Sequence, residues 1–285
     1  MKALVGKVAV ITGAASGIGE ALARLCAKEG MRLALCDIHQ DKLQAVADSL
    51  RGHGAQVLTA VVDVADPLAV ETFAFDVAKA YGGCDLMINN AGVALTDTVL
   101  HGALDDMHWL MNINFWGVVH GCRSFLPYLQ RADEAALVNV SSIFAMLSVP
   151  TQSIYNASKA AVRAFSDALR EELADTAVTL TCVHPGGIKT DIARHARVGD
   201  CSLVAQDRGD MVADFDRLAR TSPQAAAAAI LNAVKRKQTR VLIGPDAALI
   251  DGLYRLCPAS VASLGARFTQ FRLKRRRAAK PVNAV

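Results

Sequence analysis

The chain has 285 residues, of which 52% are hydrophobic, and a formal net charge of +4 at pH 7. This length suits one large α/β domain with a well-filled core. No apolar run approaches the 18 or so residues of a membrane-spanning helix, which argues against an integral helical membrane protein. The seven cysteines are scattered and include no Cys-x-x-Cys pair. We therefore expect reduced thiols, a cytoplasmic location and no metal site.

The charge is unevenly distributed along the chain. Residues 252–285 contain eight basic and no acidic side chains, so the preceding part carries 31 − 8 = 23 basic against 27 acidic residues. We expect a domain over residues 1–250 and a basic C-terminal extension over 251–285. Apolar residues recur at helical spacing in this extension, at Val261, Leu264, Phe268 and Phe271.

Two interpretations of this pattern stay open. It predicts either a basic amphipathic helix that makes peripheral contact with an anionic membrane, or a docking helix with a solvated basic end. Nucleic-acid binding is not expected, because the sequence offers no element that would read bases.

Short runs rich in Val, Leu and Ile alternate with longer helical patterns along the whole chain. This alternation predicts a single-domain, doubly wound α/β Rossmann fold with a seven-stranded parallel sheet. The expected strands are 8–11, 33–36, 57–62, 86–88, 137–140, 180–183 and 241–243, and the expected helices are 19–29, 42–51, 67–81, 104–129 and 155–173. A long irregular region, about 188–222, predicts a lid over a site, with plain disorder as the alternative.

A glycine-rich turn follows the first expected strand directly, in Thr12-Gly13-Ala14-Ala15-Ser16-Gly17-Ile18-Gly19. Glycines in this pattern permit a tight turn, close approach of the backbone to a pyrophosphate, and close packing of the next helix. The start of that helix presents unpaired N–H groups and the positive end of its dipole. The turn therefore predicts a dinucleotide site.

Asp37 ends the second expected strand, eighteen residues after Gly19. A carboxylate there can accept hydrogen bonds from the adenosine ribose hydroxyls and would repel a 2′-phosphate. No Arg or Lys follows at once, because the next residues are Ile38 and His39. The pattern favours NAD, with NADP less favoured. An N-cap for the next helix is the structural alternative for Asp37.

Tyr155 and Lys159 lie four residues apart, and Tyr155 follows Ser142 by thirteen residues. On a helix this spacing places both side chains on one face, where an ammonium beside a phenol favours the phenolate. An ordinary phenol, with a pKa of about 10, would exchange protons poorly at neutral pH. The spacing alone is also common on amphipathic surface helices.

Taken together and in order, these motifs resemble those of the short-chain dehydrogenase/reductase family in its short form. The resemblance covers roughly residues 5–245 and does not extend to the lid or the last forty residues. The matching motifs are Thr12 to Gly19, Asp63-Val64, Asn89-Asn90-Ala91-Gly92, Asn112-Ile113-Asn114, Ser141-Ser142, Tyr155 to Lys159, and Pro185-Gly186 with Thr190.

The resemblance implies four catalytic residues. Tyr155 would be the general acid/base, and Ser142 would hydrogen-bond the substrate oxygen. Lys159 would lower the pKa of Tyr155 and bind the nicotinamide ribose, and Asn114 would support a water chain from Lys159 to solvent. The alternative for Asn114 is a buried helical side chain bonded to the backbone.

The resemblance also implies a set of cofactor contacts. Asp63 and Val64 would frame the adenine, and Asn90 would lie by the adenosine-side ribose. Ile188 and Thr190 would contact the carboxamide. The full expected set is Gly13, Ser16, Gly17, Ile18, Gly19, Asp37, Ile38, Asp63, Val64, Asn90, Ala91, Gly92, Tyr155, Lys159, Pro185, Gly186, Ile188 and Thr190.

Apolar residues surround the expected substrate position, at 93–95 and 143–147. They predict a hydrophobic substrate, with core packing as the alternative. The expected substrate-binding residues are Ser142, Phe144, Gln152 and Tyr155. Arg194, His195 and Arg197 would attract an acidic group or form a solvated lid face.

The sequence therefore predicts NAD-dependent interconversion of a hydrophobic secondary alcohol and its ketone, of steroid, lipid-derived or aromatic type. Three alternatives remain: an NADP-dependent ketone reductase, a non-catalytic NAD-binding redox sensor, and an epimerase or dehydratase with tightly held NAD. A sensor would be expected to lose part of the Ser, Tyr and Lys set, and an epimerase usually has a longer C-terminal domain. By resemblance, helices 104–129 and 155–173 would pair chains into a homodimer or homotetramer.

Overall fold

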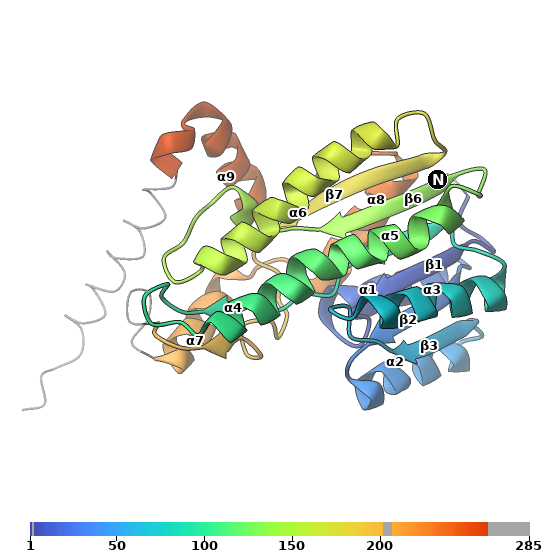
Figure 1. The fold of residues 1–285 in the computed structure, drawn as a ribbon, viewed down its shortest axis with the longest axis horizontal. Coiled ribbons are helices and arrows are strands. Elements are labelled where there is room, and N and C mark those ends of the chain that lie inside the picture. Colours follow the sequence, from blue (N-terminus) through green and yellow to red (C-terminus); the bar gives the residue numbers. More distant parts are fainter. Residues whose placement is uncertain (2, 202–206, 262–285) are drawn as a thin grey trace, which may run out of the picture.

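The computed structural model describes residues 1, 3–201 and 207–261. The expected amphipathic pattern beyond Val261 lies outside these residues. The described chain forms three layers, a sheet between two layers of helices (Figure 1). Within this part of the chain, no helix combines the length and apolarity needed to cross a bilayer.

The central sheet has seven parallel strands in the order β3-β2-β1-β4-β6-β7-β9. Strand order reverses beside β1, which lies between β2 and β4. Ligands of open α/β sheets bind at such a reversal, outside the carboxyl ends of the strands. The predicted Rossmann fold is confirmed. The strands are β1 (Val8–Thr12), β2 (Arg32–Asp37), β3 (Val57–Val61), β4 (Leu86–Asn89), β6 (Ala135–Val140), β7 (Val178–Pro185) and β9 (Arg240–Ile243).

The strands are apolar on both faces because helices cover both. Ile11 of β1 joins the core under one helix layer, whereas its neighbour Val10 joins the core under the other. This alternation follows from the two-residue period of a strand. The first layer contains α1 (Gly17–Lys28), α2 (Gln40–Gly52) and α8 (Pro223–Lys235), and the second contains α3 (Pro67–Tyr81), α5 (Gly117–Leu129) and α6 (Ser153–Glu172).

The helix expected at 104–129 contains an irregular turn. It consists of α4 (Leu104–Met111), a π-helical turn η1 (Asn112–Trp116) and α5. The N–H of Gly117 donates to the carbonyl of Asn112, five residues earlier, in place of the usual four. Such turns are frequent at functional sites, and this one carries Asn114.

The described part of the expected lid contains regular structure. A short strand, β8 (Arg197–Val198), pairs with β5 (Leu95–Thr96), and α7 covers Arg208–Leu218. The guanidinium of Arg197 forms an ion pair with Asp106 and lies 3.8 Å from the ring centroid of Trp109. These contacts attach the lid to α4.

After β9 the chain forms α9 (Pro245–Leu256). The expected domain boundary at residue 250 falls inside this helix. Ala247, Ile250 and Tyr254 pack against Ile143 and Met146, which belong to the segment after β6. This segment begins with the short helical turn η2 (Ile143–Ala145).

Candidate active site

Ser142 and Tyr155 meet at the carboxyl edge of the sheet. Ser142 follows β6 and is the N-cap of η2, while Tyr155 lies in the first turn of α6. The Ser142 hydroxyl lies close enough to the Tyr155 phenol to lower its pKa. The Ser142 Oγ accepts a hydrogen bond of 3.1 Å from the N–H of Phe144, which holds the serine side chain in place.

The expected effect of Lys159 on Tyr155 is not seen in this structure. Burial raises the pKa of the Tyr155 phenol, and the hydrogen bond with Ser142 opposes this only in part. The Lys159 Nζ lies 5.8 Å from the ring centroid and donates to the carbonyl of Val140 at 3.2 Å. Burial also disfavours the ammonium and lowers the pKa of Lys159 to about 8. Burial is thus the largest influence on the Tyr155 pKa, and the lowering of this pKa by Lys159 stays a prediction.

Residues inside and next to the Tyr-x-x-x-Lys motif fix its geometry, and sequence reasoning missed them. Asn156 Nδ2 donates to the carbonyls of Phe144 and Leu147, at 2.8 Å each, and so holds the segment after Ser142. Ser141 Oγ donates to the carbonyl of Lys159 at 2.8 Å. The sequence does not show which backbone carbonyls Ser141 and Asn156 bind, because these contacts form only when the two segments pack together.

Asn114 is fully buried and binds the backbone of Val93, in the segment after β4 that is expected to face the substrate. Its Oδ1 accepts from the N–H of Val93 at 2.8 Å, and its Nδ2 donates to the carbonyl of Val93 at 2.9 Å. Asn114 is therefore a buried helical side chain bonded to the backbone, which was the alternative to a catalytic role. Its role in a water chain stays a prediction. A Cβ on Gly92 would lie 3.2 Å from Asn114 Oδ1 and 3.4 Å from Lys159 Nζ. Glycine thus brings the backbone close to both residues.

The glycine-rich turn has the geometry expected of a phosphate cradle. Gly13 and Gly17 have φ values of 64° and 57°, which favour glycine. A Cβ on Gly19 would collide with the carbonyl oxygen of Gly13. Ser16 is the N-cap of α1 and makes no capping hydrogen bond with its side chain. The start of α1, including Ile18, therefore presents free N–H groups at the sheet edge.

Asp37 lies beside this cradle, at the end of β2. Its Oδ2 accepts from the N–H of Ala15 at 3.0 Å, and its Oδ1 accepts from the N–H of His39 at 3.0 Å. The N-cap of α2 is His39, so the N-cap interpretation of Asp37 is wrong. The carboxylate is instead fixed next to the glycine-rich turn, with Ile38 exposed beside it.

Asn90 and Ala91 brace the turn from β4. The amide of Asn90 donates to the carbonyls of Thr12 and Gly13, at 2.9 and 3.1 Å. The backbone N–H groups of Asn90 and Ala91 both donate to Thr12 Oγ1 at 3.0 Å. The side-chain amide N–H groups of Asn90 are thus engaged by the protein, and its expected ribose contact stays a prediction.

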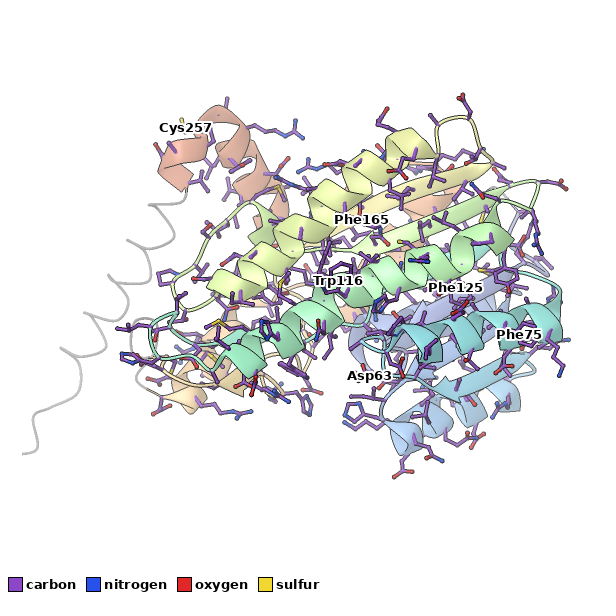
Figure 2. All side chains as sticks on the ribbon, in the orientation of Figure 1. Asp63, Phe75, Trp116, Phe125, Phe165 and Cys257 are labelled. Carbon is purple, nitrogen blue, oxygen red and sulfur yellow. The ribbon has the colours of Figure 1, made fainter. Side chains whose placement is uncertain are left out.

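The expected adenine contacts lie after β3. Asp63 Oδ1 accepts from the N–H of Ala65 at 2.9 Å, and the side chain is exposed at this end of the sheet (Figure 2). Val64 is buried, and a Cβ on Gly117 would meet its side chain. The adenine contact stays a prediction.

The segment expected at the nicotinamide follows Pro185, the last residue of β7. The N–H of Gly187 donates to Asp246 Oδ2 at 2.7 Å, and a Cβ on Gly186 would collide with the same carboxylate. Asp246 comes from the first turn of α9 and was missed. The sequence Gly-Pro-Asp at residues 244–246 is typical of a helix start, but nothing in it indicates that Asp246 binds the N–H of Gly187.

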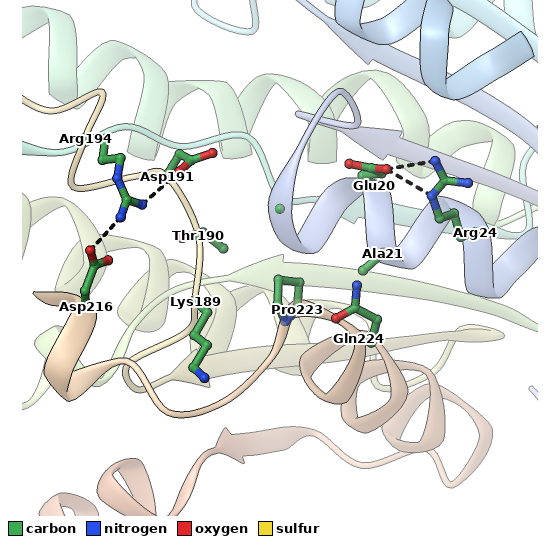
Figure 3. A pocket seen from close by; sticks show the side chains of 11 residues that line it. Glu20, Ala21, Arg24, Lys189, Thr190, Asp191, Arg194, Asp216, Pro223 and Gln224 are labelled. Carbon is green, nitrogen blue, oxygen red and sulfur yellow. Dashed lines mark hydrogen bonds and ion pairs between the residues drawn. The ribbon is translucent and has the colours of Figure 1, made fainter. Parts of the chain in front are cut away.

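A cavity of about 430 Å³ is lined by residues of α1 and of the segment after β7, among them Thr190 (Figure 3). A Cβ on Gly17 would lie 3.1 Å from the Thr190 side chain. Its charged side chains are largely paired. Arg24 forms an ion pair with Glu20, and Arg194 forms ion pairs with Asp191 and Asp216. Because Arg194 and Arg197 are already neutralised by carboxylates, the structure gives no support for their attracting an acidic substrate group.

The expected substrate side is mainly apolar. The ring of Phe144 meets that of Tyr155 edge to face, with centroids 5.9 Å apart. Leu95, Met107 and Leu110 form a small cluster against which Tyr155 packs. Gln152 Nε2 donates to Thr96 Oγ1 at 2.7 Å, so its amide is tied to β5.

The sequence and the fold of this chain are similar to those of known proteins. The family model described as short chain dehydrogenase matches residues 7–199. The chain belongs to this family.

Relatives of this short-chain dehydrogenase cover nearly its whole length. It is 42% identical over 267 residues to the Mycobacterium tuberculosis protein SadH, whose assignment as an oxidoreductase is itself provisional; the match covers 93% of this chain and 95% of SadH. A short-chain dehydrogenase/reductase from Burkholderia phymatum, solved in complex with NAD, has a TM-score of 0.80 and 32% identity over 90% of this chain and 96% of that one.

A third match is an alcohol dehydrogenase from the archaeon Thermococcus sibiricus, solved with 5-hydroxy-NADP. Its TM-score is 0.70 and its identity 28%, over 84% of this chain and 94% of that one. The chain is therefore an oxidoreductase of the short-chain dehydrogenase family.

Proposed function

We propose that this protein uses NAD to interconvert a secondary alcohol and a ketone. The observation that carries this proposal is the placement of Ser142 and Tyr155 next to each other at the carboxyl edge of the sheet, the edge that also carries the glycine-rich cradle. A proton donor and a hydrogen-bond donor converge there at one point on the carboxyl edge of the sheet, where open α/β sheets bind their ligands.

The residues present fit a dinucleotide. The cradle at Gly13 and Gly19 leaves no room for a Cβ, and the N–H groups at the start of α1 suit a pyrophosphate. The fixed carboxylate of Asp37 suits ribose hydroxyls. When bound, NAD would supply the hydride acceptor for alcohol oxidation.

The side chains of the protein would donate and accept the proton of the substrate oxygen. Tyr155 would exchange it with the substrate oxygen, and the Ser142 hydroxyl would hold that oxygen near the phenol. The raised pKa of Tyr155 keeps the phenol protonated at neutral pH in this state, which suits proton donation to a ketone. Lys159, with a pKa of about 8, can carry a proton behind Tyr155.

We propose NAD as the preferred cofactor, with an NADP-dependent ketone reductase as the alternative. Asp37 supports NAD because a fixed carboxylate would repel a 2′-phosphate. The Burkholderia relative was solved with NAD and the Thermococcus relative with an NADP analogue, so the family accommodates both.

The apolar surroundings of Tyr155 support a hydrophobic substrate. The Phe144 ring and the cluster of Leu95, Met107 and Leu110 lie beside the phenol. A steroid, lipid-derived or aromatic secondary alcohol would bury its apolar body there while its hydroxyl reaches Ser142.

The experiment is a panel of secondary alcohols and ketones, polar and hydrophobic, assayed by NADH absorbance with the parent protein and with Ser142→Ala. We expect turnover of hydrophobic members, reduced by about 100-fold or more in Ser142→Ala. NAD binding by calorimetry without any turnover across the panel would instead support the redox-sensor alternative.

We also propose a cytoplasmic homodimer or homotetramer that pairs through α4, α5 and α6. Trp116, at the junction of α4 and α5, is 48% exposed. Phe115 packs edge to face against Phe165 of α6. Trp116 and Phe165 both lie on the helix layer that faces the viewer in Figure 2. Light scattering of the purified chain tests this state.

A further inference from the structure

Helix α9 presents an uncharged stripe to solvent. Residues three or four positions apart share one side of a helix, and apart from Arg255 the exposed residues of α9 are apolar or small. Leu249, Leu253 and Leu256 have exposed fractions of 65%, 38% and 80%. Pro245, Ala248 and Gly252 are exposed between them. These six residues are called the α9 stripe.

The carboxylates of α9 are engaged with the body of the protein. Asp246 accepts from Gly187, as described. Asp251 has an 8% exposed side chain and accepts hydrogen bonds from Arg240 and Arg255. The Arg240 hydrogen bond holds the pKa of Asp251 at about 2. Asp251 is thus paired with two arginines and Asp246 is bonded to the segment after β7, so neither carboxylate belongs to the stripe.

The stripe is a second apolar face of the same helix. The inner face is already buried, because Ala247, Ile250 and Tyr254 pack against Ile143 and Met146. A helix at a protein surface normally shows one apolar face and one polar face. The helix stands at an edge of the molecule, and its end at Cys257 is directed away from the sheet (Figures 1 and 2).

The charge of the following sequence indicates what the stripe meets. Residues 252–285 carry eight basic and no acidic side chains. We propose that the α9 stripe docks on the surface of a bilayer that contains anionic lipids, with these basic residues attracted to the headgroups. Apolar residues entering the interface next to a cluster of Lys and Arg form the usual combination for such binding.

Other occupants fit less well. A second copy would bring the same positive charge to the same place. Nucleic acid would match the charge but offers phosphates, not an apolar layer, to three leucines. Twelve residues of helix span about 18 Å, which is short for a stable protein interface of about 800 Å² per partner.

Docking would have a consequence for catalysis. The inner face of α9 contacts the segments next to Ser142 and Gly187. The catalytic edge of the sheet would therefore lie near the lipid surface. This consequence rests on the proposed function, whereas the docking does not.

The test is sedimentation of the full chain with vesicles of phosphatidylcholine alone or with phosphatidylglycerol. The test variant carries Leu249→Gln and Leu256→Gln. A matched control carries Val61→Gln and Leu68→Gln, which replace residues 57% and 71% exposed at the opposite end of the sheet. Thermal unfolding and NAD binding of each variant report folding independently of lipid.

We expect binding to the anionic vesicles only, weakened by added salt. Replacing arginines between Arg272 and Arg277 by Gln should weaken it roughly fivefold for each. The stripe variant should bind at least about tenfold more weakly, and the control should match the parent.

Equal binding of the stripe variant and the parent, or no binding to anionic vesicles, would overturn the proposal. A concentration-dependent dimer that the stripe variant abolishes would assign the face to a second copy instead. Stronger vesicle binding after deletion of residues 262–285 would show that this segment covers the stripe, which also contradicts the proposal.

Discussion

The carboxylate of Asp246 accepts a 2.7 Å hydrogen bond from the backbone N–H of Gly187. The contact joins the first turn of α9 to the segment after β7. Because a Cβ on Gly186 would collide with the same carboxylate, only glycine at this position lets the segment approach Asp246 so closely. The position expected for the nicotinamide is thus held by a helix from outside the motifs.

Replacing Asp246 by Ala should weaken NAD binding. The N–H of Gly187 would lose a charged acceptor, a loss worth roughly 10- to 100-fold in an affinity that depends on it. We expect the KM for NAD and the calorimetric dissociation constant to rise together, with Asp246→Asn recovering part of the loss through its amide oxygen. The control is Asp48→Ala, which removes a 61% exposed carboxylate from α2. Equal effects of Asp246→Ala and the control would contradict the positioning role.

Asp37 should set the cofactor preference. In Asp37→Ala the repulsion of a 2′-phosphate disappears, together with the acceptor for the ribose hydroxyls. We expect kcat/KM for NAD to fall by about tenfold or more and kcat/KM for NADP to rise. The ratio of the two values, which measures the preference for NAD, should therefore decrease. Equal kcat/KM values for the two cofactors in the parent protein would refute this assignment.

His184 should make the fold sensitive to mild acid. It is fully buried behind Ser142, with its Nδ1 3.3 Å from the Ser142 carbonyl oxygen. Burial lowers the pKa of His184 from 6.5 to about 4. Between these values the unfolded chain binds a proton that the folded chain does not, so stability falls as the pH falls through this window. The total effect is on the order of 3 kcal/mol.

Urea unfolding between pH 7 and about pH 4.5 measures this dependence. His184→Gln keeps a donor for the Ser142 carbonyl but cannot titrate, so its free energy of unfolding should vary less with pH across the window. Asp251, with a pKa of about 2, loses its contribution mainly below about pH 4, outside this range. Parallel curves for the parent and His184→Gln would contradict the assignment.

The fold could be predicted because its strands are buried on both faces. Runs such as that of β1, Val8 to Thr12, are short, apolar and followed by glycine, which distinguishes them from helices. The π-helical turn at Asn112 could not be predicted, since it is confined to one turn within a continuous helical pattern. Neither could β8, which has only two residues and depends on pairing with β5.

The site was predictable where it depends on local motifs and not where it depends on packing. Ser142 and Tyr155 meet as expected, but Asn156 and Asp246 act through partners distant in sequence. The raised pKa of Tyr155 could not be predicted because burial is a property of the folded chain. Spacing on a helix shows which side chains are neighbours but not how much water remains around them.

The central claim is that Tyr155 transfers the proton of a hydride-transfer reaction, and Tyr155→Phe tests it most directly. The change removes the hydroxyl and keeps the ring that packs against Phe144. Tyr128→Phe, in the distant half of α5, is the matched control. With the best substrate of the panel, we expect kcat of Tyr155→Phe to fall by a factor of about 1,000 or more, with NAD affinity within a few fold of the parent and the control unaffected. Retained turnover by Tyr155→Phe would contradict the account.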